Sequence, residues 1–318
     1  MALDGTGMIQ RGTLVVIGGP TASGKTNAAA TLARHYGTEV ISADSRQFYK
    51  AMRIGTARPG EEELLGVKHH FVGHLELEQT WSAGQFAREA EPVLQELLGE
   101  HGIAVLVGGS GLYIDALTKG LDPLPTSDPR LRERLQHRAV QHGLAGLLKE
   151  LEEHDPSTFQ RIDRNNPHRV IRALEVCLLT GEPYSAQRTA PTDREDVRIV
   201  RIAMDLPRAD LYRRIDARVD RMVADGLVEE ARALTPHKEL NALRTVGYRE
   251  LFEYFRSTQT ISEEGGSLEK AIALIKQHTR NYAKRQMTWL RRDGGWAWIA
   301  PENTAAMVLT IDPVRAQI

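Results

Sequence analysis

Short apolar runs alternate with helix-like stretches along the first third of the chain. Three of these runs are predicted to be strands: Leu14–Ile17, Glu39–Ile41 and Ile103–Val107. Short runs of this kind, bounded by turn residues, are typical of strands that are covered on both faces. A capping box that begins at Ser82 predicts a helix running to about Leu98. The alternation therefore predicts an α/β fold with a parallel sheet flanked by helices.

The alternation stops after Leu121, where a proline-rich linker begins. Polar residues that precede a proline predict helix starts beyond it, and glycines predict helix ends. These residues are Asp128, Asp155, Asn166, Gly143 and Gly181. Because no strand pattern occurs among them, residues 122–195 are expected to form an all-helical insertion domain. It divides an α/β core whose two parts are residues 1–121 and 196–318.

Both patterns return in the C-terminal part. Arg198–Met204 and Trp296–Ile299 predict strands, whereas Arg208–Ala224 and Leu268–Arg291 predict long helices. Glu263–Gly266 predicts a turn before the second of these helices.

The turn after the first predicted strand carries a phosphate-binding pattern. Gly19–Thr26 matches G-x-x-x-x-G-K-[ST], and helix-forming residues follow it. Backbone N–H groups of such a loop, and of the helix N-terminus behind it, point at anionic oxygens. Lys25 adds a positive charge, and the Thr26 hydroxyl is suited to hold Mg²⁺. The sequence thus predicts a P-loop NTPase-like core that binds a phosphorylated ligand.

Composition excludes several classes of protein. The chain has 318 residues, of which 41% are hydrophobic, and a formal net charge of −1, as is ordinary for a globular protein. Its one cysteine, Cys177, excludes an intrachain disulfide and fits a reducing compartment. Met1–Arg11 lacks a signal-peptide pattern, and no apolar run has membrane-spanning length. We therefore expect a cytoplasmic protein that does not bind a membrane.

Asp44 follows the second predicted strand, at the sheet edge where ligands bind in parallel α/β folds. A carboxylate there is suited to act as a general base or as a water-mediated metal ligand. A helix N-cap or a surface ion pair is an equally good interpretation of its position. The third strand ends in Gly108-Gly109 and lacks the terminal Asp that holds Mg²⁺ in many nucleotidases. This difference favours a group-transfer enzyme over an ATPase.

Arg214, Arg218 and Arg221 share one face of the predicted Arg208–Ala224 helix. Guanidinium groups pair bidentately with phosphate oxygens, so these side chains are suited to clamp a diphosphate. Pairing within the helix is the alternative, with Asp210 for Arg214 and with Asp225 for Arg221. Arg218 has no such partner and is the first candidate for a catalytic arginine.

Basic residues also gather in three other segments: 168–172, 244–249 and the C-terminal helix from residue 268. A basic helix that carries Tyr282 and Trp289 is suited to nucleic-acid contact, but a solvated helix face explains the charges as well or better. Three histidines, His69, His70 and His74, match no common zinc spacing and are expected to be structural or surface residues.

Taken together, the motifs resemble those of the tRNA dimethylallyltransferases, also called the IPP transferase family. The matching segments are residues 18–26, 41–50, 52–59, 107–113, 172–176, 246–249 and 279–291. The P-loop alone is generic, but the whole set in this order is specific, and it spans roughly residues 14–292. The main departure is residues 69–74, where the family usually has an acidic residue soon after His-His-Leu and this chain has Gly73-His74.

The resemblance implies transfer of a five-carbon prenyl group from dimethylallyl diphosphate to N6 of an adenine in tRNA. That adenine is 3′-adjacent to the anticodon, in tRNAs that read codons beginning with U. Asp44 would be the general base, and Arg218 would neutralise the leaving diphosphate. Mg²⁺ would be the cofactor, held by Thr26. The diphosphate would bind the P-loop residues Gly19, Pro20, Thr21, Ala22, Ser23, Gly24, Lys25 and Thr26.

By the same resemblance, the partner is the anticodon stem-loop of tRNA, gripped by the helical insertion, and the protein is expected to be a monomer. Residues that would contact tRNA lie in both the core and the insertion. They are Asp44, Ser45, Arg46, Gln47, Ser110, Arg132, His168, Arg169, Val170, Ile171, Arg172, Arg244, Thr245, Val246, Gly247, Tyr248 and Arg249.

Two other functions fit parts of the sequence. A small-molecule kinase of the P-loop class would use ATP as donor and Asp44 as base, with an arginine-rich lid formed by Arg130, Arg132, Arg134 and Arg138. An RNA-binding GTPase-like module is the weaker alternative, because the chain has no N-K-x-D segment to read guanine.

Overall fold

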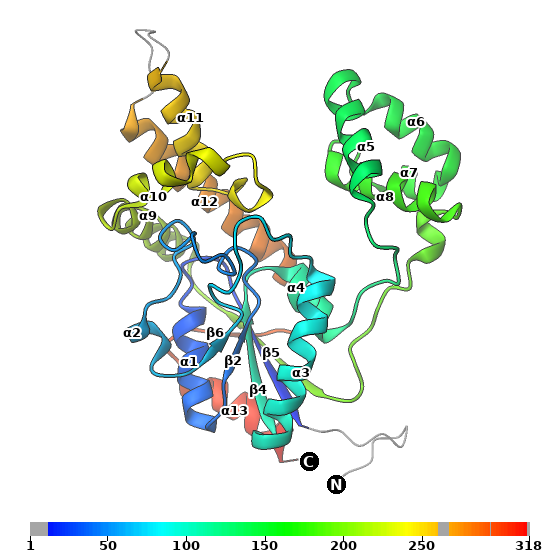
Figure 1. Cartoon of the computed structure of the whole chain (residues 1–318). Coiled ribbons are helices and arrows are strands. Elements are labelled where there is room, and N and C mark those ends of the chain that lie inside the picture. Colours follow the sequence, from blue (N-terminus) through cyan, green and yellow to red (C-terminus); the bar gives the residue numbers. More distant parts are fainter. Residues whose placement is uncertain (1–11, 260–266, 293, 317–318) are drawn as a thin grey trace. The chain divides into compact units, whose positions relative to one another are not determined.

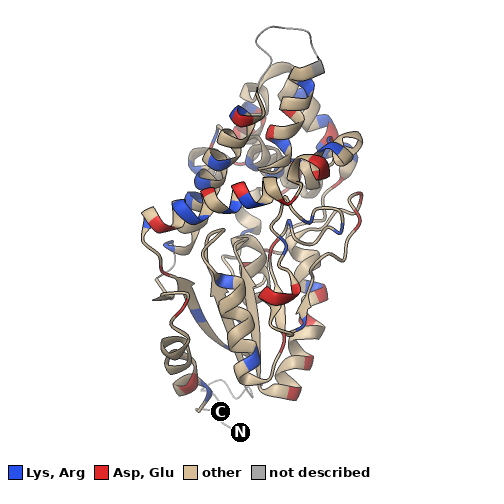
Figure 2. Cartoon of the chain, turned by 90° about the vertical axis from the view of Figure 1, so that its left-hand side faces the viewer, with Lys and Arg blue, Asp and Glu red and all other residues tan. Residues whose placement is uncertain are grey.

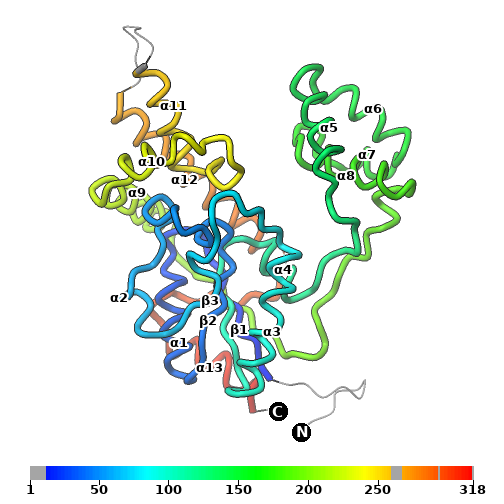
Figure 3. Tube along the Cα trace, in the orientation of Figure 1, coloured from blue at the N-terminus to red at the C-terminus, as the bar shows by residue number. Residues whose placement is uncertain are grey.

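The computed structural model describes residues 12–259, 267–292 and 294–316. The segment Met1–Arg11 and the turn expected at Glu263–Gly266 lie outside these residues. The chain divides into two compact units, one of Met1–Thr118 with Asp193–Ile318 and one of Lys119–Thr192. Figure 3 follows the chain from the first unit into the second and back.

The first unit is built on a six-stranded sheet in which every pair of neighbours is parallel. The order is β3-β2-β4-β1-β5-β6. The strands are β1 (Thr13–Gly18), β2 (Val40–Ser42), β3 (His69–His70), β4 (Ile103–Gly108), β5 (Arg198–Met204) and β6 (Ala297–Ile299). The predicted α/β class is therefore confirmed. The strand β3 was not predicted, because two residues are too few to show a period of two.

Helices cover both faces of this sheet (Figure 1). The central strand β1 alternates between two cores: Leu14 and Val16 pack in one, Val15 and Ile17 in the other. One face is covered by α3 (Ala83–His101) and α4 (Gly111–Thr118), and the other by α1 (Lys25–Tyr36) and α13 (Thr304–Arg315). Because β1 is buried on both faces, it reads as a continuous apolar run.

The remaining helices of the first unit come mainly from its C-terminal part. They are α2 (Glu61–Leu64), α9 (Arg208–Ala224), α10 (Leu227–Leu234), α11 (Tyr248–Gln259) and α12 (Leu268–Leu290), with short 3₁₀ turns at Thr235–His237 and Asn241–Leu243. Basic and acidic residues alternate along α9 (Figure 2). Two of its acids pair with α12, since Asp216 binds Arg280 and Asp220 binds Lys276.

The second unit is entirely helical where described, as predicted. It contains α5 (Pro129–His142), α6 (Ala145–His154), α7 (Pro156–Arg161), α8 (Pro167–Thr180) and a 3₁₀ turn at Tyr184–Gln187. The side chains of Asp128, Asp155 and Asn166 accept the expected capping bonds at the starts of α5, α7 and α8. Buried Leu135, Leu151 and other apolar residues give this unit a core of its own.

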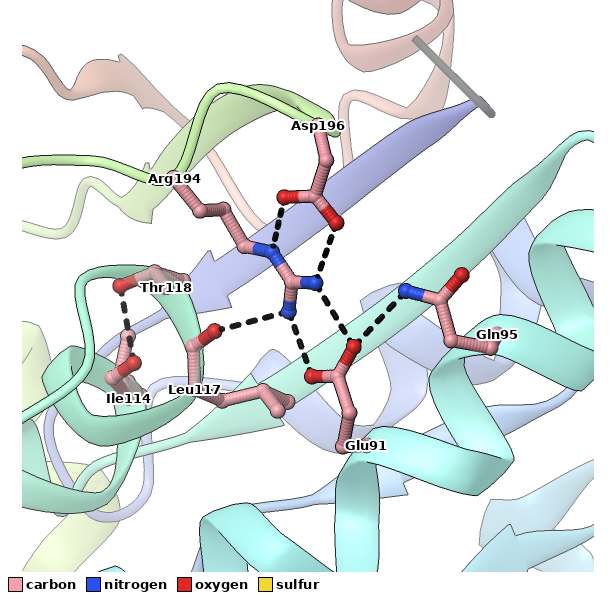
Figure 4. A network of polar contacts seen from close by, with 7 residues as sticks. All are labelled: Glu91, Gln95, Ile114, Leu117, Thr118, Arg194 and Asp196. Atoms are coloured by element: carbon pink, nitrogen blue, oxygen red, sulfur yellow. Dashed lines mark hydrogen bonds and ion pairs between the residues drawn. The ribbon is translucent and has the colours of Figure 1, made fainter. Parts of the chain in front are cut away.

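Arg194 holds the chain where it returns to the first unit (Figure 4). Its guanidinium forms ion pairs with Glu91 at 2.7 Å and with Asp196 at 2.6 Å. It also donates to the carbonyl of Leu117, and its backbone N–H donates to the carbonyl of Thr118. The outgoing and returning segments are therefore fixed side by side at the core.

Candidate active site

Three loops follow neighbouring strands at one edge of the sheet. In the register of the sheet, Gly18 at the end of β1 lies beside Gly108 at the end of β4. Ser42 at the end of β2 lies beside Val107 of β4. The P-loop, the segment that begins at Asp44 and the loop at Ser110 therefore converge at the carboxyl edge, where ligands bind in such sheets.

The P-loop, residues 19–26, turns sharply where it enters α1. Ala22 and Gly24 adopt left-handed backbone conformations, with φ of 64° and 89°. These conformations turn the chain into the N-terminus of α1, where N–H groups have no partner within the helix. The Ser23 hydroxyl is buried and has no hydrogen-bond partner among the described residues. A cradle of amides with an orphaned hydroxyl is suited to anionic oxygens.

Lys25 supplies a poorly solvated positive charge at this loop. Its Nζ atom donates to the Pro20 carbonyl at 3.4 Å. Burial lowers the pKa of Lys25 to about 8, against the opposing effect of Asp44, and Arg218 lowers it slightly further. An ammonium group that burial has already desolvated binds an anion strongly, because binding then costs little further desolvation energy.

Arg218 reaches the same loop from the middle of α9. Its Nη1 atom lies 3.4 Å from the Thr21 hydroxyl oxygen. Burial lowers the pKa of the Arg218 guanidinium, while the charges of Glu63 and Asp44 oppose this effect. The alternative interpretation, in which Asp210 pairs with Arg214, is wrong, since Asp210 binds Arg213 at 2.6 Å.

Asp44 lies at the end of β2 and faces the cavity beyond the P-loop. Its Oδ1 atom accepts a hydrogen bond from the backbone N–H of Arg46 at 3.1 Å. The next residue, Ser45, donates from its backbone N–H to the Ser110 hydroxyl at 3.3 Å. Asp44 thus keeps a carboxylate oxygen for chemistry and is not a helix cap.

A cavity of about 320 Å³ joins these groups. Thr21, Asp44 and Arg218 lie on its wall together with an apolar patch of Val219, Met222 and Ile275. The cavity is wide enough to admit a small organic group beside an anion. A second cavity, of about 10 Å³, is bounded by Lys25, Thr26, Ser42, Asp44 and His69 among others.

Most of the core residues predicted for tRNA binding lie on the wall of the large cavity. Two of the predicted residues, however, donate hydrogen bonds to backbone carbonyls of other segments. Arg46 donates from Nη1 to the carbonyls of Asn241 and Ala242, both at 3.1 Å. Gln47 donates to the carbonyls of Thr56 and Ala57, both at 3.2 Å. Gln47 therefore braces the loop at residues 56–57, and Arg46 braces the segment before Arg244.

The loop at residues 244–249 lies on the same cavity through Arg244, Thr245, Val246, Gly247 and Arg249. Tyr248 is the exception, because its side chain is fully buried and donates to Glu230 at 2.6 Å. Burial and the Glu230 carboxylate raise the pKa of this phenol. The ring of Tyr248 is therefore part of the core, and tRNA contact at this position stays a prediction.

In the helical unit, His168 and Arg169 are exposed at the start of α8. Val170 and Ile171 are buried in the core of the unit, and tRNA contact by this segment stays a prediction. Arg172 lies beside the buried Glu175, which it binds at 2.8 Å. Arg132 binds the same carboxylate at 2.5 Å.

His70 and His74 have contacts within the fold. His70 binds Glu39 at 2.6 Å, and His74 packs against Trp81 with ring centroids 5.1 Å apart. A side chain at Gly73, whose φ is +60°, would overlap the Arg58 guanidinium, which gives a physical reason for glycine there. Within residues 12–259, 267–292 and 294–316, no three His, Cys, Asp or Glu side chains gather as a metal site.

Among the lining residues that were not predicted from the sequence are Tyr282, Arg285 and Gln286 of α12. Burial raises the pKa of Tyr282 to about 12, and the Asp44 carboxylate adds to this effect. Their spacing of i, i+3 and i+4 on a basic helix was the available signal. A solvated face was preferred because charge alone does not say which face meets the core.

Comparisons with known proteins identify the family of the chain. A family model described as IPP transferase matches residues 47–293. The tRNA dimethylallyltransferase of Christiangramia forsetii is 46% identical over 285 residues, which cover 90% of this chain and 92% of that protein. Among the described residues, no helix is long and apolar enough to cross a membrane.

Solved structures give the same result. The tRNA isopentenylpyrophosphate transferase of Bacillus halodurans is 33% identical, with a TM-score of 0.68 over 96% of both chains. A eukaryotic dimethylallyltransferase acting on tRNA shares the fold at 22% identity, with a TM-score of 0.77 over 95% of this chain and 77% of that one. From its motifs, its site and these relatives, the chain belongs to the IPP transferase family, that of the tRNA dimethylallyltransferases.

Proposed function

We propose that this protein transfers a dimethylallyl group from dimethylallyl diphosphate to N6 of the adenine 3′-adjacent to the anticodon, in tRNAs that read codons beginning with U. The observation that carries the proposal is one cavity of about 320 Å³ that joins the P-loop, Arg218 and Asp44. The relatives named as tRNA dimethylallyltransferases support the reaction.

The donor's diphosphate would bind the P-loop. Lys25 and Thr26 line the small cavity beside this loop, and the buried Ser23 hydroxyl has no hydrogen-bond partner among the described residues. Hard oxygen ligands suit Mg²⁺, and Thr26 shares the small cavity with Asp44, so Thr26 would hold the ion and the carboxylate would reach it through water. When bound, Mg²⁺ would neutralise charge on the diphosphate oxygens.

Asp44 is the base in this proposal. An adenine amine is a weak nucleophile, since its lone pair is delocalised into the ring. The N6–C1 bond forms as the C1–O bond of the donor breaks, and the diphosphate leaves with the bonding electrons. The N6 proton passes to the Asp44 carboxylate. Arg218 and Lys25 stabilise the charge that grows on the leaving group.

The acceptor adenine would enter from the side of the cavity lined by Arg244, Gly247 and Arg249. It must leave the anticodon-loop stack to reach Asp44, so a flipped base is expected. In the helical unit, exposed His168 and Arg169 would contact phosphates of the anticodon stem, which position RNA without reading its sequence. We expect a monomer in the cytoplasm.

The kinase alternative receives no support from the comparisons. Two of the four arginines expected in its lid are engaged elsewhere, as Arg132 binds the buried Glu175 and Arg138 binds Glu150. Side chains held in this way are poorly placed to swing onto ATP.

The test is product analysis. The protein is incubated with Mg²⁺, dimethylallyl diphosphate and unmodified tRNA, with and without ATP. The tRNA is then digested to nucleosides, and their masses are measured by mass spectrometry. One added prenyl unit on adenosine, independent of ATP, supports the proposal. No mass gain, or a gain that requires ATP, refutes it. A Lys25→Met variant serves as the negative control.

A further inference from the structure

Gln286 connects the P-loop to the loop after β4. Its Oε1 atom accepts a hydrogen bond from the backbone N–H of Thr21 at 2.9 Å. Its Nε2 atom donates to the carbonyl of Gly109, also at 2.9 Å. The residue is 6% exposed, so both bonds lie in a region that water hardly reaches. A buried carboxamide with one partner on each end is held in a single orientation.

The neighbouring backbone is shaped to admit this carboxamide. A Cβ atom on Gly109 would overlap the Nε2 atom of Gln286 and would press on the carbonyl of Gly19 at 3.1 Å. Glycine at position 109 therefore leaves room for the Gln286 carboxamide between the P-loop and the loop after β4. Residue 286 lies 265 positions from Thr21 in the sequence.

Packing of α12 does not by itself require a glutamine there. The helix is anchored by buried apolar residues, including Ala271, Ile275, Ala283 and Leu290. A buried amide is costly unless it is hydrogen-bonded, so an apolar residue would serve packing alone at least as well. The two bonds of Gln286 end on Thr21, which lies on the wall of the large cavity, and on Gly109, which follows Gly108 on the wall of the small one.

We propose that Gln286 is a positioning residue for the donor: its carboxamide fixes the Thr21 peptide, and with it the Thr21 side chain that meets Arg218 at 3.4 Å. The inference rests on the proposed function, because it assigns to α12 a role in binding the donor's diphosphate. The same helix lines the acceptor side of the cavity through Tyr282 and Arg285. Through Gln286, the conformation of the P-loop thus depends on the position of α12, the helix that also lines the acceptor side of the cavity.

The test is Gln286→Met, which keeps the length of the side chain and removes both hydrogen bonds. Gln277→Met is the matched control, since Gln277 is exposed on the same helix. Dissociation constants for inorganic diphosphate with Mg²⁺ and for tRNA are measured by calorimetry, along with Tm and the KM for dimethylallyl diphosphate. Loss of one buried hydrogen bond predicts a weakening of diphosphate binding of roughly tenfold.

Three results together support the inference. In Gln286→Met, diphosphate binding weakens and the donor KM rises by roughly tenfold. The affinity for tRNA stays within about twofold of the wild-type value, and Gln277→Met resembles the wild type. Unchanged diphosphate affinity in a folded Gln286→Met protein overturns it. An equal loss of tRNA and diphosphate affinity also overturns it, because that pattern indicates general disruption of the fold.

Gly109→Ala is a second, independent variant if Gln286→Met does not fold. It displaces the carboxamide without changing α12 and is expected to weaken diphosphate binding in the same way. Normal diphosphate binding by Gly109→Ala contradicts the inference. If the wild type makes no prenylated tRNA, the proposed function fails, while the diphosphate affinities still decide the role of Gln286.

Discussion

The Nη1 atom of Arg218 lies 3.4 Å from the Oγ1 atom of Thr21, which brings the middle of α9 to the P-loop. The two residues are 197 positions apart in the sequence. Their proximity gives the P-loop a second cation besides Lys25, on the side that faces the large cavity. A diphosphate held by the loop would therefore lie between a helix N-terminus and a guanidinium.

Arg218→Gln is expected to slow prenyl transfer by roughly 10²-fold, because a fixed charge that stabilises the leaving group is lost. Single-turnover rates with saturating donor and tRNA measure this effect. Arg213→Gln is the control, since Arg213 lies on the same helix with 76% of its side chain exposed. Equal rates for Arg218→Gln and the wild type would contradict a role for Arg218 in stabilising the leaving diphosphate.

Asp44→Asn is expected to reduce transfer by 10²–10⁴-fold, which is the usual range for loss of a general base. Affinity for tRNA should stay close to that of the wild type, because the amide keeps the shape of the carboxylate. Single-turnover rates and tRNA binding measured on the same preparation separate the two effects. Weak tRNA binding with a normal rate at saturating tRNA would instead make Asp44 a binding residue.

Donor affinity is expected to fall as pH rises above about 8, where Lys25 loses its proton. The pKa of Lys25 is lowered by burial, so its charge is lost well below the usual range for lysine. Lys25→Arg should flatten this dependence, since arginine remains charged. Calorimetric titration with dimethylallyl diphosphate between pH 7 and pH 9.5 measures it; a wild-type affinity that does not change with pH contradicts the assignment.

Lys25 also predicts a stability effect without donor. Folding lowers the pKa of its ammonium, so the charged form destabilises the folded protein below about pH 8. Lys25→Met should accordingly leave Tm unchanged or raise it at pH 7. A marked fall in Tm would show that Lys25 is needed for the fold itself.

Stability is expected to decrease as pH falls below about 6.5, in part because of His74. Burial among aromatic rings lowers the pKa of His74, and neither ring nitrogen has a partner among the described residues. Below that pH, His74 binds a proton in the unfolded chain but not in the folded chain, which lowers the free energy of unfolding. Its full contribution to stability is therefore present only above about pH 6.5. His74→Phe should reduce the difference in unfolding free energy between pH 7.5 and pH 5.5, as measured with urea. An unchanged difference would exclude His74 as a cause.

The sequence was sufficient where function depends on local pattern. The P-loop between Leu14–Ile17 and the following helix was predicted from adjacent residues, as were the capped helices that begin after Asp128, Asp155 and Asn166. In each case the physical cause lies within a few residues: backbone N–H groups that need partners, or a proline that fixes φ. Arg218 was singled out because its helix offered it no acidic partner.

Prediction failed where a role depends on which residues meet in three dimensions. Charge on α12 did not reveal that Gln286 reaches Thr21, because the contact spans 265 positions. Val170 and Tyr248 lie in segments that the resemblance assigns to tRNA contact, but the pattern did not show that their side chains are buried. A motif marks a segment, whereas the fold decides which of its side chains face inward.

The most direct test of the account is a crystal structure with Mg²⁺ and a thio analogue of dimethylallyl diphosphate that resists transfer. The account predicts diphosphate density at the P-loop, residues 19–26, within bonding distance of Lys25 and Arg218, with the prenyl group in the cavity beside Asp44. A P-loop that stays empty at saturating analogue, or that binds only ATP in a parallel soak, would contradict it.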